Sequence, residues 1–144
     1  MGSKYKKFIK KGIYQPLQNI PFHNKATFLK RLLMQDKSTF PDLKRILPGS
    51  NYHIAVHIIN KLPKKVPKYV EPHIHNCDEI NLILSEKGKL VYKITMGNES
   101  YTVSSPSIVY VPRRVAHTAE AVRGKGIYFC IVMSKSYKDS LVKE

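Results

Sequence analysis

The order of apolar and polar residues changes character near Ser50. Beyond this point, β-branched and aromatic residues come in short runs separated by turn residues roughly every eight to twelve positions, which is typical of β-strands. The expected strands span residues 52–59, 68–72, 79–85, 89–96, 99–104, 107–111, 117–122 and 127–134. This succession of short strands predicts a mainly β fold, a double-sheet jelly roll or barrel.

The first fifty residues show a different pattern. Residues 1–12 are polar and rich in lysine, and the apolar residues at 13–17 indicate an extended arm. Asn24 can cap a helix, and the apolar residues after it recur at helical spacing: Phe28, Leu29, Leu32 and Leu33. One helix is therefore expected from Asn24 to Met34. A further helical turn is expected over 41–47, because Pro48 and Gly49 would end it.

These patterns define the expected organisation. With 144 residues, 42% of them hydrophobic, and no linker rich in glycine or proline, the chain fits one domain. We expect an arm and a short helical extension at 1–50 that packs on a barrel at 51–134, followed by a tail at 135–144. No apolar run approaches the roughly 18 to 20 residues of a membrane span, and no secretory signal is recognisable. The expected location is the cytoplasm, without membrane contact.

The net charge of +15 is concentrated in the front half of the chain. Residues 1–70 hold 15 basic and two acidic residues, whereas residues 71–144 hold 10 basic and eight acidic ones. The lysine clusters lie in no helix-turn-helix, zinc-finger or RNA-binding motif, which argues against a nucleic-acid partner. A solubilising surface and an electropositive funnel for an anionic small substrate both remain open.

Two short segments carry residues suited to metal binding. In a strand, residues two apart point to the same face, so His73 and His75 can direct two imidazoles toward one interior point. A turn at 76–78 then returns the chain into the next strand, where Glu79 can offer a carboxylate. Downstream, a segment that begins at Pro112 places His117 at the start of another strand.

This pattern resembles the cupin superfamily. The first cupin motif has two histidines separated by one residue, followed by a glutamate and then a glycine. His73, His75 and Glu79 match it. The second begins with proline and ends with histidine, as Pro112 and His117 do. The resemblance covers about residues 70–134 and implies a single cupin jelly-roll barrel. It also implies one divalent metal ion on the four matching ligands: His73, His75, Glu79 and His117. Such a set suits Fe, Mn, Ni or Zn without choosing among them.

Three further residues are candidates for substrate binding. Asn81 shares the strand face of Glu79 and can point inward near the metal. Arg113 and Arg114 could clamp a carboxylate or phosphate at the mouth of the barrel, or face outward as surface residues. His53 and His57 lie four apart on the first strand, where they either face the interior or serve as ordinary strand residues.

The resemblance implies a metal-dependent enzyme that acts on a small molecule. Within the family, the same ligand set supports dioxygenases, which we expect first, and also non-redox isomerases, epimerases and lyases that act on a sugar or hydroxy acid. A cupin that binds a small ligand without turning it over is the third reading. Oxygen consumption separates the first two. We also expect a homodimer, which is the commonest assembly of soluble oligomers and usual among proteins with this resemblance.

Overall fold

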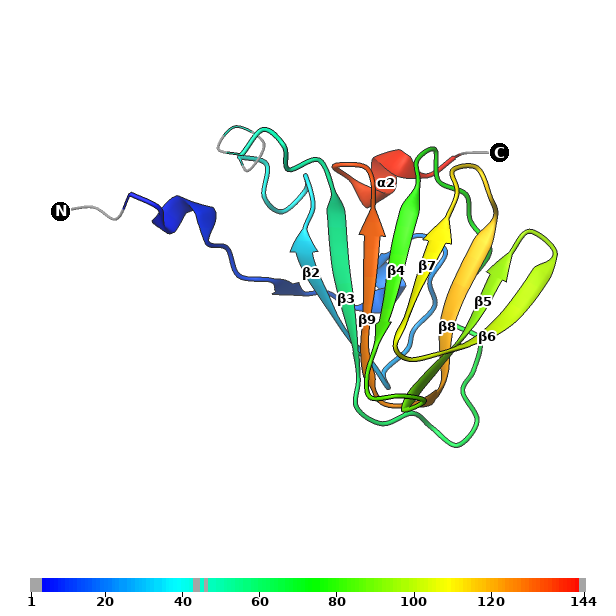
Figure 1. Cartoon of the computed structure of the whole chain (residues 1–144). Coiled ribbons are helices and arrows are strands. Elements are labelled where there is room, and N and C mark those ends of the chain that lie inside the picture. The colour runs from blue at the N-terminus through cyan, green and yellow to red at the C-terminus, as the bar shows by residue number, and fades with distance from the viewer. Residues whose placement is uncertain (1–3, 43–44, 46, 143–144) are drawn as a thin grey trace.

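Two antiparallel β-sheets face each other in the computed structural model, which describes residues 4–42, 45 and 47–142 (Figure 1). The larger sheet has the strand order β1 (Ile13–Tyr14), β2 (Lys30–Gln35), β3 (His53–Ile59), β9 (Gly126–Val132), β4 (Glu79–Leu84) and β7 (Ser107–Val111). The smaller sheet has the order β6 (Glu99–Ser104), β5 (Leu90–Met96) and β8 (His117–Gly124). This arrangement confirms the predicted mainly β jelly roll.

Most of the expected strands form at the expected places, but the one at 68–72 does not. In this segment Val70 makes a single bridge to His23, and the pairing resumes only at isolated bridges from His73 and His75. Pro67 and Pro72 flank the segment, and proline has no backbone N–H to donate to a ladder. A continuous strand is therefore prevented here, although the chain still follows an extended path.

The helix predicted from Asn24 to Met34 is wrong. Residues Lys30–Gln35 form β2, which pairs with β1 on one side and β3 on the other. Arg31 and Leu33 are buried while Lys30 and Met34 are exposed, so the segment follows the two-residue period of a strand. The free edge of β3 offers a ladder of hydrogen bonds, and this tertiary pairing overrides the helical spacing of the leucines.

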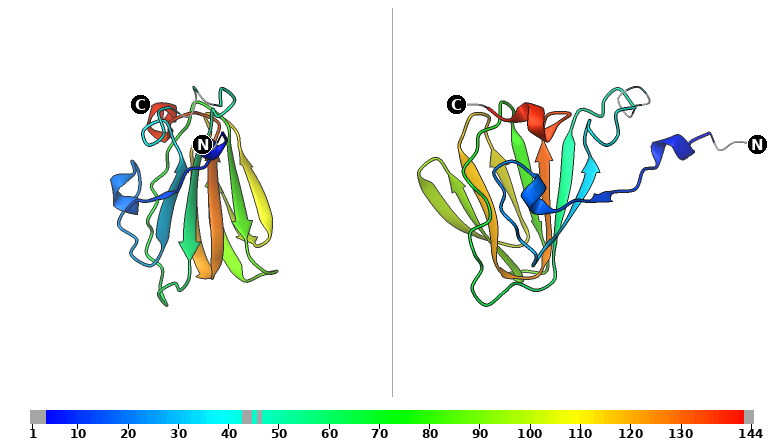
Figure 2. Two further views of the ribbon diagram at one scale, coloured as in Figure 1. Left: turned by 90° about the vertical axis from the view of Figure 1, so that its left-hand side faces the viewer. Right: turned by 180° about the vertical axis from the view of Figure 1, so that it is seen from behind.

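Helical structure in the described part of residues 1–50 is limited to short turns. The turn η1 covers Lys6–Phe8, and η2 covers Leu17–Asn19. The helical turn expected over 41–47 falls partly on residues outside those that the structure describes. The segment that contains η2 runs across the barrel when it is seen from behind (Figure 2), and Leu17 and Leu29 join the core there. The extension is therefore mostly extended chain rather than helix.

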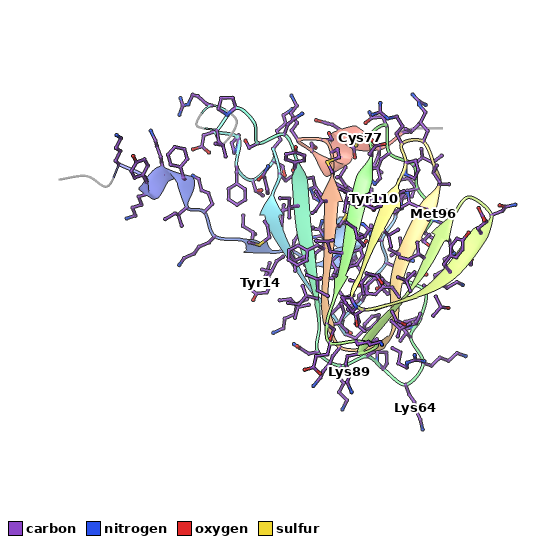
Figure 3. The ribbon with its side chains drawn as sticks, in the orientation of Figure 1. Tyr14, Lys64, Cys77, Lys89, Met96 and Tyr110 are labelled. Atoms are coloured by element: carbon purple, nitrogen blue, oxygen red, sulfur yellow. The ribbon has the colours of Figure 1, made fainter. Side chains whose placement is uncertain are left out.

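The hydrophobic core lies between the two sheets. Its buried side chains include Tyr92 and Tyr128, whose rings stack with centroids 4.6 Å apart. The helix α2 (Tyr137–Ser140) covers the end of the barrel at which β9 finishes (Figure 1). Figure 3 shows Cys77 beside α2 and Lys89 at the opposite end. Among the described residues, no helix is long and apolar enough to cross a membrane. The end covered by α2 is where polar side chains gather in the interior.

Candidate metal centre

Backbone pairing brings the two metal-binding segments together. Glu79 is the first residue of β4 and His117 the first of β8. His73 forms an antiparallel bridge with His117, in which the His73 N–H donates to His117 O at 3.3 Å and the His117 N–H donates to His73 O at 3.1 Å. His75 lies two residues further along the same extended segment. The ladder therefore places residues that are distant in sequence side by side.

The four predicted ligands meet at one buried point. The ligand nitrogens of His73, His75 and His117 all lie within 4.8 Å of one another. Glu79 Oε1 lies 3.3 Å from His75 Nε2 and 3.4 Å from His117 Nε2. The most accessible of the four residues, His73, is only 7% exposed. The three imidazoles therefore lie close enough together to hold one ion, and the Glu79 carboxylate lies beside two of them.

Each of the three imidazoles has its Nδ1 engaged in a hydrogen bond, and of the three Nε2 atoms only that of His73 has a hydrogen-bond partner among the described residues, the Tyr137 hydroxyl. His73 Nδ1 donates to Glu71 O at 2.8 Å, and His117 Nδ1 donates to Val115 O at 3.0 Å. His75 Nδ1 lies 2.7 Å from Ser140 Oγ, whose own hydrogen is donated to a backbone oxygen of α2. Because each Nδ1 is a donor, each Nε2 keeps its lone pair, which is the form that binds a metal ion.

Several polar atoms at this point lack hydrogen-bond partners among the described residues. They are His75 Nε2, His117 Nε2 and Glu79 Oε1. A buried polar atom without a partner costs about 1–3 kcal/mol, so three of them converging on one place call for a bound group. Asn81 Nδ2 donates to Glu79 Oε2 at 2.8 Å and thereby leaves Oε1 facing the imidazoles. The donor set fits a divalent metal ion.

The electrostatics of the cluster match this interpretation. Burial alone would raise the pKa of Glu79, but the His117 and His75 imidazoles hold the pKa of that carboxyl well below its usual range. Burial, assisted by His117, lowers the pKa of His73 to about 3. Burial also opposes the charged form of His117, yet the Glu79 carboxylate raises the pKa of His117 above its ordinary value. Near neutral pH the centre thus holds an ionised carboxylate and a neutral His73.

A cavity of about 30 Å³ adjoins the cluster and reveals residues that sequence reasoning missed. Beside three of the ligands it is lined by the side chains Ile20, His23, Arg31, His57, Val70, Ala119, Tyr128, Cys130 and Tyr137. The Tyr137 hydroxyl lies 3.1 Å from His73 Nε2. His57 faces inward, as one of the two sequence readings allowed. Arg31 could not be recognised, because its segment was read as a helix.

A second, larger hollow shares His73 with this cavity. It measures about 660 Å³ and opens among largely apolar residues that include Phe22, Ile74 and Leu141. Phe22 also stacks on the His73 ring, with centroids 5.6 Å apart. His73 therefore lines both the small inner cavity and the larger hollow.

The two arginines proposed as a clamp lie elsewhere. Arg113 and Arg114 are exposed in the connection between β7 and β8, and neither lines the cavity. The backbone N–H of Arg113 donates to Asp78 Oδ1 at 2.9 Å, and its side chain faces the same carboxylate at 3.5 Å. Arg114 adopts a φ of 65°, a left-handed conformation that glycine adopts more easily. The backbone N–H of Arg114 donates to His75 O at 2.8 Å, so the role of the two arginines in substrate binding stays a prediction.

Comparison with known proteins finds similarity at the level of structure alone. No family model and no curated protein matches the sequence. Among solved structures, KdgF from Halomonas sp. is 12% identical, with 88% of this chain and 91% of that chain covered and a TM-score of 0.52. A variant of B. subtilis oxalate decarboxylase is 12% identical over 94% of this chain and 33% of that chain, with a TM-score of 0.53. Hazelnut (Corylus avellana) vicilin is 16% identical over 88% and 32%, with a TM-score of 0.56.

Proposed function

We propose that this chain, which has the cupin fold, is a metal-dependent enzyme that acts on a small anionic molecule. The observation that carries the proposal is the convergence of His75 Nε2, His117 Nε2 and Glu79 Oε1, all buried and without partners among the described residues. His73 Nε2 completes the set and lies 3.1 Å from the Tyr137 hydroxyl. One divalent ion of Fe, Mn, Ni or Zn is the expected occupant.

Four protein ligands leave two positions open on an octahedral ion, and open positions are a requirement for catalysis. When bound, iron would supply electrons to dioxygen, whereas a redox-inert ion would polarise a carbonyl or hydroxyl group. We propose a dioxygenase-type reaction first. The narrow inner cavity supports it, because a space of about 30 Å³ holds little water and so protects a reactive centre from side reactions.

A non-redox reaction of the lyase, isomerase or epimerase type is the second candidate, and one residue favours it. The Tyr137 hydroxyl lies 3.1 Å from His73 Nε2, and burial raises the pKa of Tyr137 well above its ordinary value. The phenol therefore keeps its proton at neutral pH, in a position to donate it to a substrate atom at the centre. Proton transfer, rather than oxygen chemistry, would then be the main task of the protein.

Metal content and oxygen uptake test the proposal together. Protein purified without a histidine tag is analysed for its metals, stripped, reloaded separately with Fe, Mn, Ni and Zn, and assayed against small organic acids in an oxygen electrode. Oxygen uptake that depends on a substrate and occurs with iron but not with the other three ions supports the dioxygenase. Turnover without oxygen uptake supports the non-redox enzyme. Ligand binding without product from any acid favours a non-catalytic cupin, and failure to retain any of the four ions contradicts the proposal.

A further inference from the structure

One buried cation lies beside the candidate metal centre without an acidic partner. Arg31 on β2 is only 5% exposed and lines the inner cavity together with His57 and Tyr128. The strand register explains why these three residues lie side by side. Arg31 pairs with His57 across β2 and β3, and His57 pairs with Tyr128 across β3 and β9. The three side chains thus form one row on the inner face of the larger sheet.

The hydrogen bonding of Arg31 is incomplete. Its Nη1 donates to Gln15 Oε1 at 2.5 Å. Within the described part of the chain, Arg31 forms no ion pair with a carboxylate. Asp36 is occupied by His53, at 2.7 Å from Oδ1, and by the Ser38 hydroxyl, at 2.6 Å from Oδ2. Burial of a charge without an ion-pair partner is costly, and Gln15 is the one side-chain hydrogen-bond partner of Arg31 among the described residues.

The rest of the inner cavity also lacks negative charge other than that of Glu79. The cavity contains His57, whose Nδ1 is buried and unpartnered, and burial lowers the pKa of this imidazole well below its ordinary value. Glu79 already faces His75 and His117. A divalent ion and the Glu79 carboxylate together would carry a net charge of +1. The loaded chamber would therefore hold a surplus of positive charge to which Arg31 adds.

We infer that Arg31 binds the carboxylate of a small organic acid that reaches into the cavity beside the metal centre. The inference rests on the proposed function and gives it a substrate class. The guanidinium fork matches a carboxylate, which can accept two parallel hydrogen bonds. A cavity of about 30 Å³ admits a group of this size but no sugar ring.

Acetate and acetamide are suitable probes, because they have nearly the same shape and only acetate is charged. Affinity is measured by calorimetry for the wild type, Arg31→Met, Arg31→Lys and, as a matched control on the same strand, the exposed Lys30→Met. The wild type binds acetate and not acetamide. Arg31→Met loses about 10- to 100-fold in acetate affinity, as expected for bonds between charged groups. Arg31→Lys keeps part of the binding, and Lys30→Met resembles the wild type.

The melting temperature without ligand separates a binding role from a structural one. If Arg31 is retained for a ligand, Arg31→Met removes a mostly buried charge that has no ion-pair partner among the described residues, and the melting temperature does not fall. A structural Arg31 would give a lower melting temperature instead. Unchanged acetate affinity in Arg31→Met with its metal retained overturns the inference, as does a wild type that does not prefer acetate. Either of these two results would overturn the inference about Arg31 but not the proposed metal-dependent function.

A wild type that retains no metal would contradict the proposed function but not the inference about Arg31. Acetate binding to the metal-free protein would then still test Arg31.

Discussion

His75 Nδ1 lies 2.7 Å from the hydroxyl oxygen of Ser140, a fully buried residue of α2. The Ser140 hydroxyl donates to Tyr137 O at 2.6 Å, so its oxygen is left to accept the hydrogen of His75. This contact connects the tail of the chain to the candidate metal centre. Residues 135–144 were expected to be a simple tail, yet they contribute the group that orients one predicted ligand.

Removal of this contact should weaken metal binding without removing a ligand. In Ser140→Ala, the His75 Nδ1 loses its acceptor, and metal affinity is expected to fall about 10- to 100-fold. Competition with a chelator measures the affinity. The control is Ser136→Ala, because Ser136 caps α2 through Asp139 N and does not contact His75. Equal affinity in the wild type and Ser140→Ala would show that the hydrogen bond does not position the imidazole.

Acid should destabilise the fold through Asp36. Burial alone would raise the pKa of this carboxyl, but bonds from His53, Ser38 and the Tyr137 N–H lower the pKa below its ordinary value. A carboxyl with a depressed pKa stabilises the native state above the unfolded pKa of about 3.9, and this stabilisation is lost progressively as the pH falls below it. Urea unfolding from pH 7 to pH 2 should therefore show a free energy of unfolding that drops most steeply below about pH 4.5.

The variant Asp36→Asn isolates the contribution of this carboxylate. It should be less stable than the wild type by about 1–3 kcal/mol at pH 7, since buried donors lose a charged acceptor. Its stability should depend less on pH in the acid range. The exposed Asp42→Asn serves as the control and should follow the wild type. Parallel pH profiles for the wild type and Asp36→Asn would exclude Asp36 as the source of the acid sensitivity.

The outer face of the larger sheet supports the expected homodimer. Adjacent strands β9, β4 and β7 present exposed apolar side chains on this face: Ile127 (40%), Leu84 (39%), Ile108 (46%) and Tyr110 (66%). Tyr110 is marked in Figure 3. Neighbouring exposed apolar side chains of this kind often mark an interaction site. A two-fold contact between two such faces would cover the patch on both copies.

Light scattering tests this assembly. The wild type should be a dimer at about 10 μM, and Tyr110→Lys should shift it toward monomer, because a two-fold interface would bury two lysine charges, one from each copy. Tyr101→Lys is the matched control, since Tyr101 is 46% exposed on β6 of the other sheet. A monomeric wild type, or a Tyr110→Lys variant that remains dimeric, would contradict an interface on this face.

Only part of the cluster could be predicted from local geometry. The two-residue period of extended chain aligns His73 with His75. Glu79 and His117 were expected as ligands because their segments resemble two cupin motifs, and a distant backbone pairing brings His117 to His73. Asn81 followed from the same parity. Its contact with Glu79 could not be predicted, because a strand period specifies a face but not a hydrogen-bond partner.

The remaining residues of the site could not be found in this way, because tertiary pairing brings them in. Arg31 faces the cavity only because β2 pairs with β3, and the spacing of the leucines around it fits a helix as well as a strand. Tyr137 reaches His73 from a helix of four residues. Local patterns predict the inward face of a strand, but they do not show which distant segment closes the end of a barrel.

The central claim is that one metal ion is held where the four predicted ligands meet, and metal content of the double variant His73→Ala/His75→Ala tests it most directly. The matched control is His57→Ala, which removes another buried imidazole of the cavity but none of the cluster. Circular dichroism should show a folded β protein for all three proteins. The account predicts about one ion per chain in the wild type and in His57→Ala, and a loss of nearly all metal from the double variant. Full occupancy in a folded double variant would contradict it.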